Sequence, residues 1–188
     1  MLDPNWVFVS AALGMVGCVR YVIATLTGSA RPNLVTWTLW AAAPLIAFAA
    51  QVDAGAGLPA VLTLAAGAGP LLVVAAGLLT RHDRVRIGAF DVACGTVAVV
   101  ALAVWLVFDA APLAVFVAVG ADAAAAAPTV RKAWRDPGSE NLLFYVLVGL
   151  GAILTLLTVT TWDPVAWAFA AYMLTLCGLV VAVVALRR

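Results

Sequence analysis

Charged residues are scarce in this chain. Lys, Arg, Asp and Glu make up 10% of the 188 residues and the net charge is +1, whereas a soluble domain has about a quarter charged residues. The few cations are spread over several short segments, so we expect no nucleic-acid partner. Hydrophobic residues make up 66% of the chain, which is more than a soluble core needs. This composition predicts an integral membrane protein.

Cysteine and histidine are also rare. Cys18, Cys94 and Cys177 lie inside long apolar stretches, no CxxC pair occurs, and the single histidine, His82, lies in a basic segment. We therefore expect neither a disulfide framework nor a metal site. The chain has no HExxH or GxSxG motif, and its single lysine, Lys132, lies in a polar segment, unsuited to a retinal Schiff base. We expect no enzymatic activity and no cofactor.

Seven long apolar stretches recur along the chain. Each has about 18 to 22 residues, which is enough to cross about 30 Å of hydrocarbon as a helix. We place them at 6–27, 34–51, 59–80, 88–108, 112–130, 140–161 and 165–186. The sequence thus predicts an all-α integral membrane fold with seven transmembrane helices.

Basic residues occur on one side only of this arrangement. They are Arg20, Arg31, Arg81, Arg84, Arg86, Arg131, Lys132, Arg135, Arg187 and Arg188. The charged residues at the other ends of the stretches are acids: Asp3, Asp53, Asp109 and Asp163. Because basic residues in short loops stay in the cytoplasm, we expect a multi-pass protein of the plasma (inner) membrane with its N-terminus outside and its C-terminus in the cytoplasm.

Two proline-centred polar turns, 28–37 and 134–145, have a similar pattern. Matching Asn33 with Asn141 gives an offset of 108 residues. Both turns lie on the basic side, so the repeats are predicted to be parallel, and two parallel three-helix units need one extra crossing between them. We therefore expect a first three-helix bundle at 1–80, a linker helix at 81–110 and a second three-helix bundle at 111–188.

The run from Asp122 to Trp134 contains Pro128 and Thr129 before a basic turn. It resembles the PQ-loop motif, in which a Pro-Gln or Pro-Thr pair ends a helix. SWEET sugar facilitators, lysosomal amino-acid exporters and KDEL receptors share that superfamily fold. The resemblance implies seven helices, an external N-terminus and two three-helix bundles. Residues 31–40 also resemble a group of bacterial SWEET-like membrane proteins of unassigned role.

Asp122 is the leading candidate for a substrate contact, because it lies near the middle of the fifth stretch, where a charged aspartate costs about 3 kcal/mol. It is either a substrate-contacting or proton-linked carboxylate facing a cavity, or a neutral acid hydrogen-bonded to a neighbouring helix. Trp37 and Trp40 are expected to share a helix face, with Tyr145 or Phe144 at the matching place in the second half. These aromatic residues either line a substrate site or belong to an interfacial belt. Asn141 completes the predicted substrate-binding set.

Arg20 and Tyr21 lie in the inner third of the first stretch and are candidate gating residues. Arg20 either snorkels to the interface or closes a gate by pairing with an acid such as Glu140 or Asp91. Asp91 lies close to the start of the fourth stretch, where an acidic side chain is favourable, and we interpret it as a helix-start residue.

Proline supplies two further gating candidates. Pro44 lies inside the second stretch, where it removes a backbone hydrogen bond and predicts a kink that is either a hinge or a static bend. Pro128 is expected to end its helix, with a role at a gate.

Two functions follow. The first is a SWEET-like transporter or facilitator that moves a sugar, an amino acid or another small polar metabolite across the lipid bilayer by alternating access, with Asp122 as a candidate for proton linkage. The alternative is a non-transporting receptor or scaffold with the same fold, binding a ligand as KDEL receptors do. The substrate, the coupling ion, the direction of transport and the oligomeric state stay open.

Overall fold

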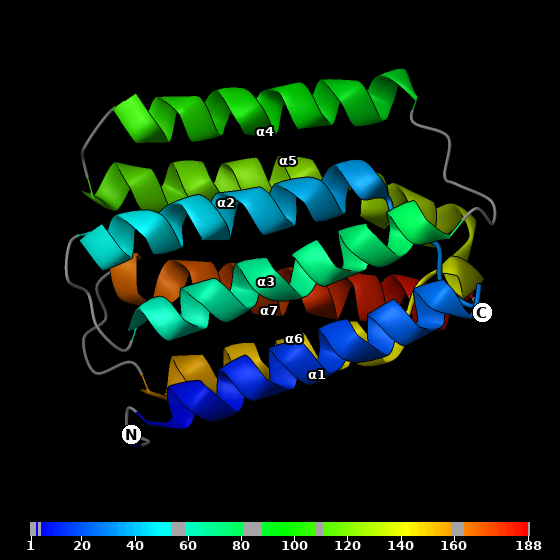
Figure 1. Ribbon diagram of the computed structural model, residues 1–188, viewed down its shortest axis with the longest axis horizontal. Coiled ribbons are helices and arrows are strands. Elements are labelled where there is room, and N and C mark those ends of the chain that lie inside the picture. The colour runs from blue at the N-terminus through cyan, green and yellow to red at the C-terminus, as the bar shows by residue number, and fades with distance from the viewer. Residues whose placement is uncertain are drawn as a thin grey trace.

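A computed structural model describes residues 3, 5–53, 59–80, 88–107, 111–158 and 164–187. Over these residues the chain forms seven α-helices, one short 3-10 turn and no strand, which confirms the all-α prediction. The elements are α1 (Trp6–Leu26), α2 (Leu34–Asp53), α3 (Pro59–Leu79), α4 (Ala89–Val107), α5 (Ala111–Arg135), η1 (Pro137–Ser139), α6 (Leu142–Thr158) and α7 (Pro164–Arg187). The helices lie lengthwise side by side, and the two termini are at opposite ends of the bundle (Figure 1).

Most helix limits lie within about three residues of the predicted ones, but α5 is an exception. Pro128 does not end its helix: α5 continues about two turns beyond it to Arg135. An interior proline removes one hydrogen bond from the helix ladder and its ring crowds the carbonyl of residue i−4. A helix can continue after it when later residues are held by packing. Here Ala133 is fully buried and Lys132 forms an ion pair. The expectation that Pro128 terminates the helix is therefore wrong.

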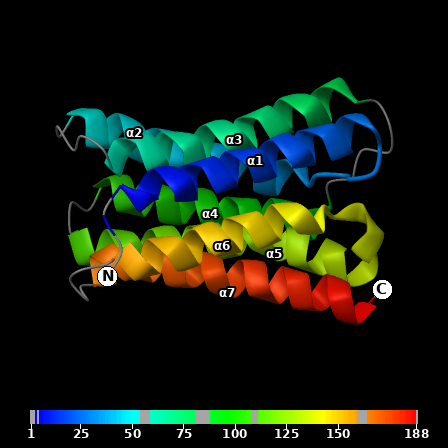
Figure 2. The same cartoon turned by 90° about the horizontal axis from the view of Figure 1, so that it is seen from below.

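The helices pack in a pattern that repeats between the two halves. In the first half α3 contacts both α1 and α2, and in the second half α7 contacts both α5 and α6. The halves meet through α1 against α6 and α2 against α5, while α4 packs on α5 and α2. Figure 2 shows α1, α2 and α3 on one side of the molecule and α5, α6 and α7 on the other.

Equivalent asparagines begin α2 and α6. The side-chain oxygen of Asn33 accepts hydrogen bonds from the backbone N–H groups of Val35, at 3.1 Å, and Thr36, at 3.3 Å. The side-chain oxygen of Asn141 accepts one from the N–H of Phe144 at 3.2 Å. Each asparagine satisfies backbone donors that a helix start leaves free. Before Asn33, Gly28 adopts a left-handed backbone with φ 78°, as helix C-termini commonly do.

Small residues bring α1 and α6 together. Ser10 donates a hydrogen bond from its hydroxyl to the carbonyl of Gly151 at 3.1 Å. A Cβ added at Gly151 would lie 3.2 Å from the Ser10 carbonyl oxygen, and one added at Gly17 would lie 3.3 Å from the Phe144 ring. Ser10 and Gly17 of α1 thus lie at this close contact, whereas a Cβ added at Gly14 has nothing within 4 Å of it among the described residues.

Large apolar side chains lie on the outside of the bundle. On α1 they follow helical spacing at Val16, Val19 and Ile23, and similar exposed residues occur on α3, α4, α6 and α7. Within the described part of the chain, the stretches Trp6–Leu26 and Trp167–Arg187 are long and apolar enough to cross a membrane, and Leu64–Leu79 and Leu142–Thr158 are shorter apolar helices.

Several residues named from the sequence fall outside the described ranges. They are Arg81, His82, Arg84, Arg86, Asp109, Asp163 and Arg188. The basic residues Arg31, Lys132 and Arg187 lie at the end of the bundle where α1, α3, α5 and α7 finish, which we call the basic end.

Candidate functional site

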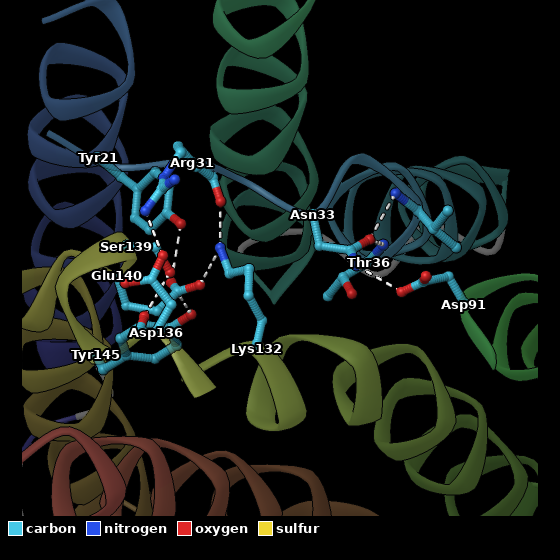
Figure 3. Close-up of polar contacts among 11 residues, drawn as sticks. Tyr21, Arg31, Asn33, Thr36, Asp91, Lys132, Asp136, Ser139, Glu140 and Tyr145 are labelled. Carbon is cyan, nitrogen blue, oxygen red and sulfur yellow. Dashed lines mark hydrogen bonds and ion pairs between the residues drawn. The ribbon is translucent and has the colours of Figure 1, made fainter. Parts of the chain in front are cut away.

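Glu140 is the centre of a buried polar network at the basic end. Its side chain is fully buried and forms an ion pair with Lys132, with 2.5 Å between Nζ and Oε1. The other carboxylate oxygen accepts hydrogen bonds from the phenols of Tyr21, at 2.8 Å, and Tyr145, at 2.9 Å. Figure 3 shows these groups converging from α1, α5 and the start of α6. One carboxylate thus joins the first half of the chain, through Tyr21, to the second.

Arg31 adds further contacts between the halves. Its guanidinium pairs with Asp136, and its carbonyl oxygen accepts a hydrogen bond from Lys132. Its backbone N–H donates to the carbonyl of Ser139 at 3.0 Å. The connection between α1 and α2 is therefore held against the connection between α5 and α6, and the two proline-centred turns meet each other directly (Figure 3).

A cluster of buried aromatic rings lies beside this network, deeper in the bundle. Trp37 is fully buried, with ring centroids 4.5 Å from Tyr21 and 5.0 Å from Phe144. Phe144 in turn lies 5.0 Å from Tyr145. On the other side Trp37 contacts Trp40 at 5.3 Å, so these two tryptophans share a helix face as predicted. Burial of Trp37 is not what an interfacial belt position predicts.

The aromatic cluster continues to Asp122, near the middle of α5. Tyr172 on α7 donates a hydrogen bond to the Asp122 carboxylate at 2.6 Å. Trp40 on α2 borders the same carboxylate, while its buried indole N–H makes no hydrogen bond of normal geometry. Asp122 therefore does contact a neighbouring helix. The structure brings it together with Trp40, as predicted, and with Tyr172, which the sequence analysis missed.

Asp91 has the role expected from the sequence. It lies in the first turn of α4, where one carboxylate oxygen accepts the N–H of Gly88 at 2.7 Å. The other oxygen accepts a hydrogen bond from the amide of Asn33 at 2.8 Å. Asp91 thus anchors the start of α4 to the cap of α2.

The predicted gating residues divide into two groups. Tyr21 and Glu140 do meet, but the cation that pairs with Glu140 is Lys132 and not Arg20. Arg20 is exposed on α1, as expected for a snorkelling side chain. It points away from Glu140 although the next residue, Tyr21, contacts Glu140, because successive side chains on a helix are rotated by about 100°. Lys132 was overlooked as a gating candidate because it was assigned to a loop, whereas α5 extends through it.

The remaining candidates are Asn141, Pro44 and Pro128, which lie at the start of a helix or inside one. Asn141 caps α6, and its role in substrate binding stays a prediction. Pro44 lies inside α2, and Pro128 is buried inside α5 next to the buried Thr129, whose hydroxyl has no hydrogen-bond partner among the described residues. Among the described residues, no group of three or more His, Cys, Asp or Glu side chains is arranged to hold a metal ion.

Two acids therefore lie at the two ends of one aromatic path. Asp122 lies at the inner end of the path and Glu140 at the basic end, with Trp40, Trp37 and Tyr145 among the rings between them. Comparison of the chain with protein-family models, with curated proteins and with solved structures found no match. The site is accordingly interpreted from its own chemistry.

Proposed function

We propose that this chain is a seven-span membrane transporter of small solutes that works by alternating access, captured with its basic end closed. The observation that carries the proposal is the network around Glu140. It joins the two halves at one end of the bundle. Tyr21 of this network packs against Trp37, the ring from which the aromatic path leads to Asp122.

The helix packing supports an arrangement of two parallel three-helix units, 1–80 and 111–188, with 81–110 as linker. Within each half the third helix contacts the first and the second. Between the halves, the first helix of each half packs on the second helix of the other, α1 on α6 and α5 on α2. Parallel repeats of this kind form transporters in which a central site lies at the interface of the repeats. Asp122, on α5, touches groups from α2 and α7.

The outer surface supports a membrane location for the whole bundle. Exposed side chains along α1, α3, α4 and α6 are mainly Val, Leu and Ile, and large contiguous apolar surfaces of this kind are avoided by soluble monomers. Arg31 follows the end of α1, and Lys132 and Arg187 lie in the last turns of α5 and α7. These helices finish at the same end of the bundle (Figure 1), which the positive-inside rule assigns to the cytoplasm. The N-terminus then lies outside and the C-terminus inside.

Rocking of one half against the other would open the basic end by breaking the contacts of Tyr21 and Arg31 with residues 132–140. The Lys132–Glu140 pair lies within the second half, so the charges can remain paired while the halves separate. This matters because leaving one buried charge without its partner is costly.

Uptake into proteoliposomes tests the proposal. We expect wild-type protein to accelerate entry of at least one small polar solute from a panel of sugars, amino acids and amines, and expect Asp122→Asn to reduce that entry. Asp3→Asn, which removes an exposed carboxylate at the opposite end of the bundle, is the matched control and should transport normally. If no solute of the panel crosses faster than in empty liposomes, the transporter proposal is wrong.

The alternative of a non-transporting receptor is distinguished by the same experiment. A receptor would be stabilised by a ligand that never crosses the membrane. Lys132 and Arg31 are both engaged by acids of this chain, so they are not free to hold the carboxylate of a ligand, which favours the transporter.

A further inference from the structure

Asp122 lacks a cationic partner in the described part of the chain. The two ion pairs there use Asp136 and Glu140. Arg131, the next basic residue along α5, is nine positions away, which is about 14 Å along a helix. The hydrogen bond from Tyr172 and the neighbouring indole of Trp40 are neutral contacts. Among the described residues, Asp122 therefore has a hydrogen-bonding phenol and an indole as neighbours but no cation.

The surroundings of Asp122 are aromatic. Tyr172 packs against Phe169, with ring centroids 6.1 Å apart, and Trp40 leads on to Trp37. Trp40 is 8% exposed, and its N–H is a buried donor without a hydrogen bond of normal geometry. A carboxylate next to aromatic rings matches the chemistry by which proteins bind organic ammonium ions, since rings attract cations through their electron-rich faces.

We propose that this Asp122–Tyr172–Trp40 cluster binds a small organic ammonium ion, and that such an ion is the substrate. This rests on the transporter proposal above and names its substrate class. The ammonium group is the cationic partner that Asp122 lacks among the described residues, and the alkyl part of the ligand packs on the aromatic rings. A bare metal cation such as Na⁺ fits less well, because it needs several oxygen ligands and the described residues here offer one carboxylate and one phenol.

Binding can be measured without transport, by thermal unfolding of the purified protein in detergent. Choline and its uncharged carbon isostere, 3,3-dimethylbutan-1-ol, differ in charge and hardly in shape. We expect choline to raise the unfolding temperature and the isostere to have no effect, with NaCl at equal concentration as the ionic control. Equal stabilisation by choline and the isostere, by choline and NaCl, or by none of them, would overturn the proposal.

Variants then locate the site. Asp122→Asn keeps the shape and an acceptor for Tyr172, and should weaken choline binding at least tenfold. Asp3→Asn, which removes an exposed carboxylate remote from the cluster and from the basic-end network, should leave binding unchanged. If Asp122→Asn does not fold, Tyr172→Phe keeps the charge and removes only the phenol hydrogen bond, and should alter choline affinity severalfold. Unchanged affinity in every folded variant at Asp122 and Tyr172 refutes the site.

Flux separates failure of this inference from failure of the transporter proposal. A chain that carries a neutral sugar at the same rate in wild type and Asp122→Asn is a transporter without an ammonium site. A chain that binds choline through Asp122 but moves no solute has the ammonium site and is a receptor.

Discussion

Replacement of Glu140 by glutamine tests whether the basic-end network holds the two halves together. Glutamine keeps the shape of the side chain and an oxygen for the phenols of Tyr21 and Tyr145. It removes the charge opposite Lys132, whose side chain is 12% exposed. Lys132 is then left largely buried without its counter-charge, and it faces an amide.

The expected cost follows from burial. Removing one partner of a buried ion pair costs about 3–5 kcal/mol, and we expect the free energy of unfolding of Glu140→Gln to fall by about that amount. Asp136→Asn is the matched control. It removes the partner of Arg31 in a pair whose side chains are 40% and 46% exposed, and such pairs contribute about 0–1 kcal/mol. Unfolding of both variants by SDS in mixed detergent micelles measures the difference.

Opening of the basic end is followed through a native thiol. Cys177 is 3% exposed and lies near both Tyr145 and Asp122. With the other two cysteines replaced by alanine, we expect Glu140→Gln to speed labelling of Cys177 by a membrane-impermeant maleimide added at the basic end. The interpretation of Glu140 as a closing contact is refuted if Glu140→Gln destabilises no more than Asp136→Asn and leaves the labelling rate unchanged.

Three other predictions concern packing, capping and orientation. Gly151→Val should lower the free energy of unfolding by about 1–3 kcal/mol, because even a Cβ would press on α1. Gly14→Ala, whose Cβ meets nothing within 4 Å among the described residues, should leave the free energy of unfolding unchanged or raise it by up to about 1 kcal/mol. Equal effects of the two variants in chemical unfolding would contradict the close contact. Asn141→Ala should cost about 1 kcal/mol as a lost cap, and Asn33→Ala should cost more because the buried Asn33 also bonds Asp91; the reverse order would rule out that second role. Green fluorescent protein fused after residue 188 should fluoresce and alkaline phosphatase fused there should be inactive, since the C-terminus is expected in the cytoplasm; the opposite result would reverse the orientation.

The helices themselves were predictable because long apolar stretches and their punctuation are local properties. Asn33 and Asn141 were matched as equivalent residues of two turns, and both cap a helix. The pairing of Trp37 with Trp40 followed from helical spacing alone. Pro128 shows where local rules fail: it is a common helix breaker, but packing of Ala133 and the ion pair of Lys132 hold the helix beyond it.

The partners of each polar residue were less predictable. Glu140 was recognised as a possible gate acid, and Arg20 was named as one possible cation for it, whereas its cation in the structure is Lys132. Position in the span was known from the sequence, but rotation about the helix axis was not. Tyr172 was missed, since one tyrosine in an apolar stretch carries no signal until α7 is placed against α5. Its contact with Asp122 joins residues 50 positions apart.

Residue types and their spacing were enough to predict the all-α class, the approximate limits of the helices and the gathering of basic residues on alternate connections. These features depend on residue type and on spacing along one helix. The packing of the helices was needed to show that the two proline-centred turns meet, that Glu140 binds Lys132 and two tyrosines, and that Asp122 lies among aromatic rings with no cation beside it in the described part of the chain. Such contacts depend on how helices from distant parts of the chain are rotated and paired. The role of a charged side chain can therefore be inferred only when the groups around it are known.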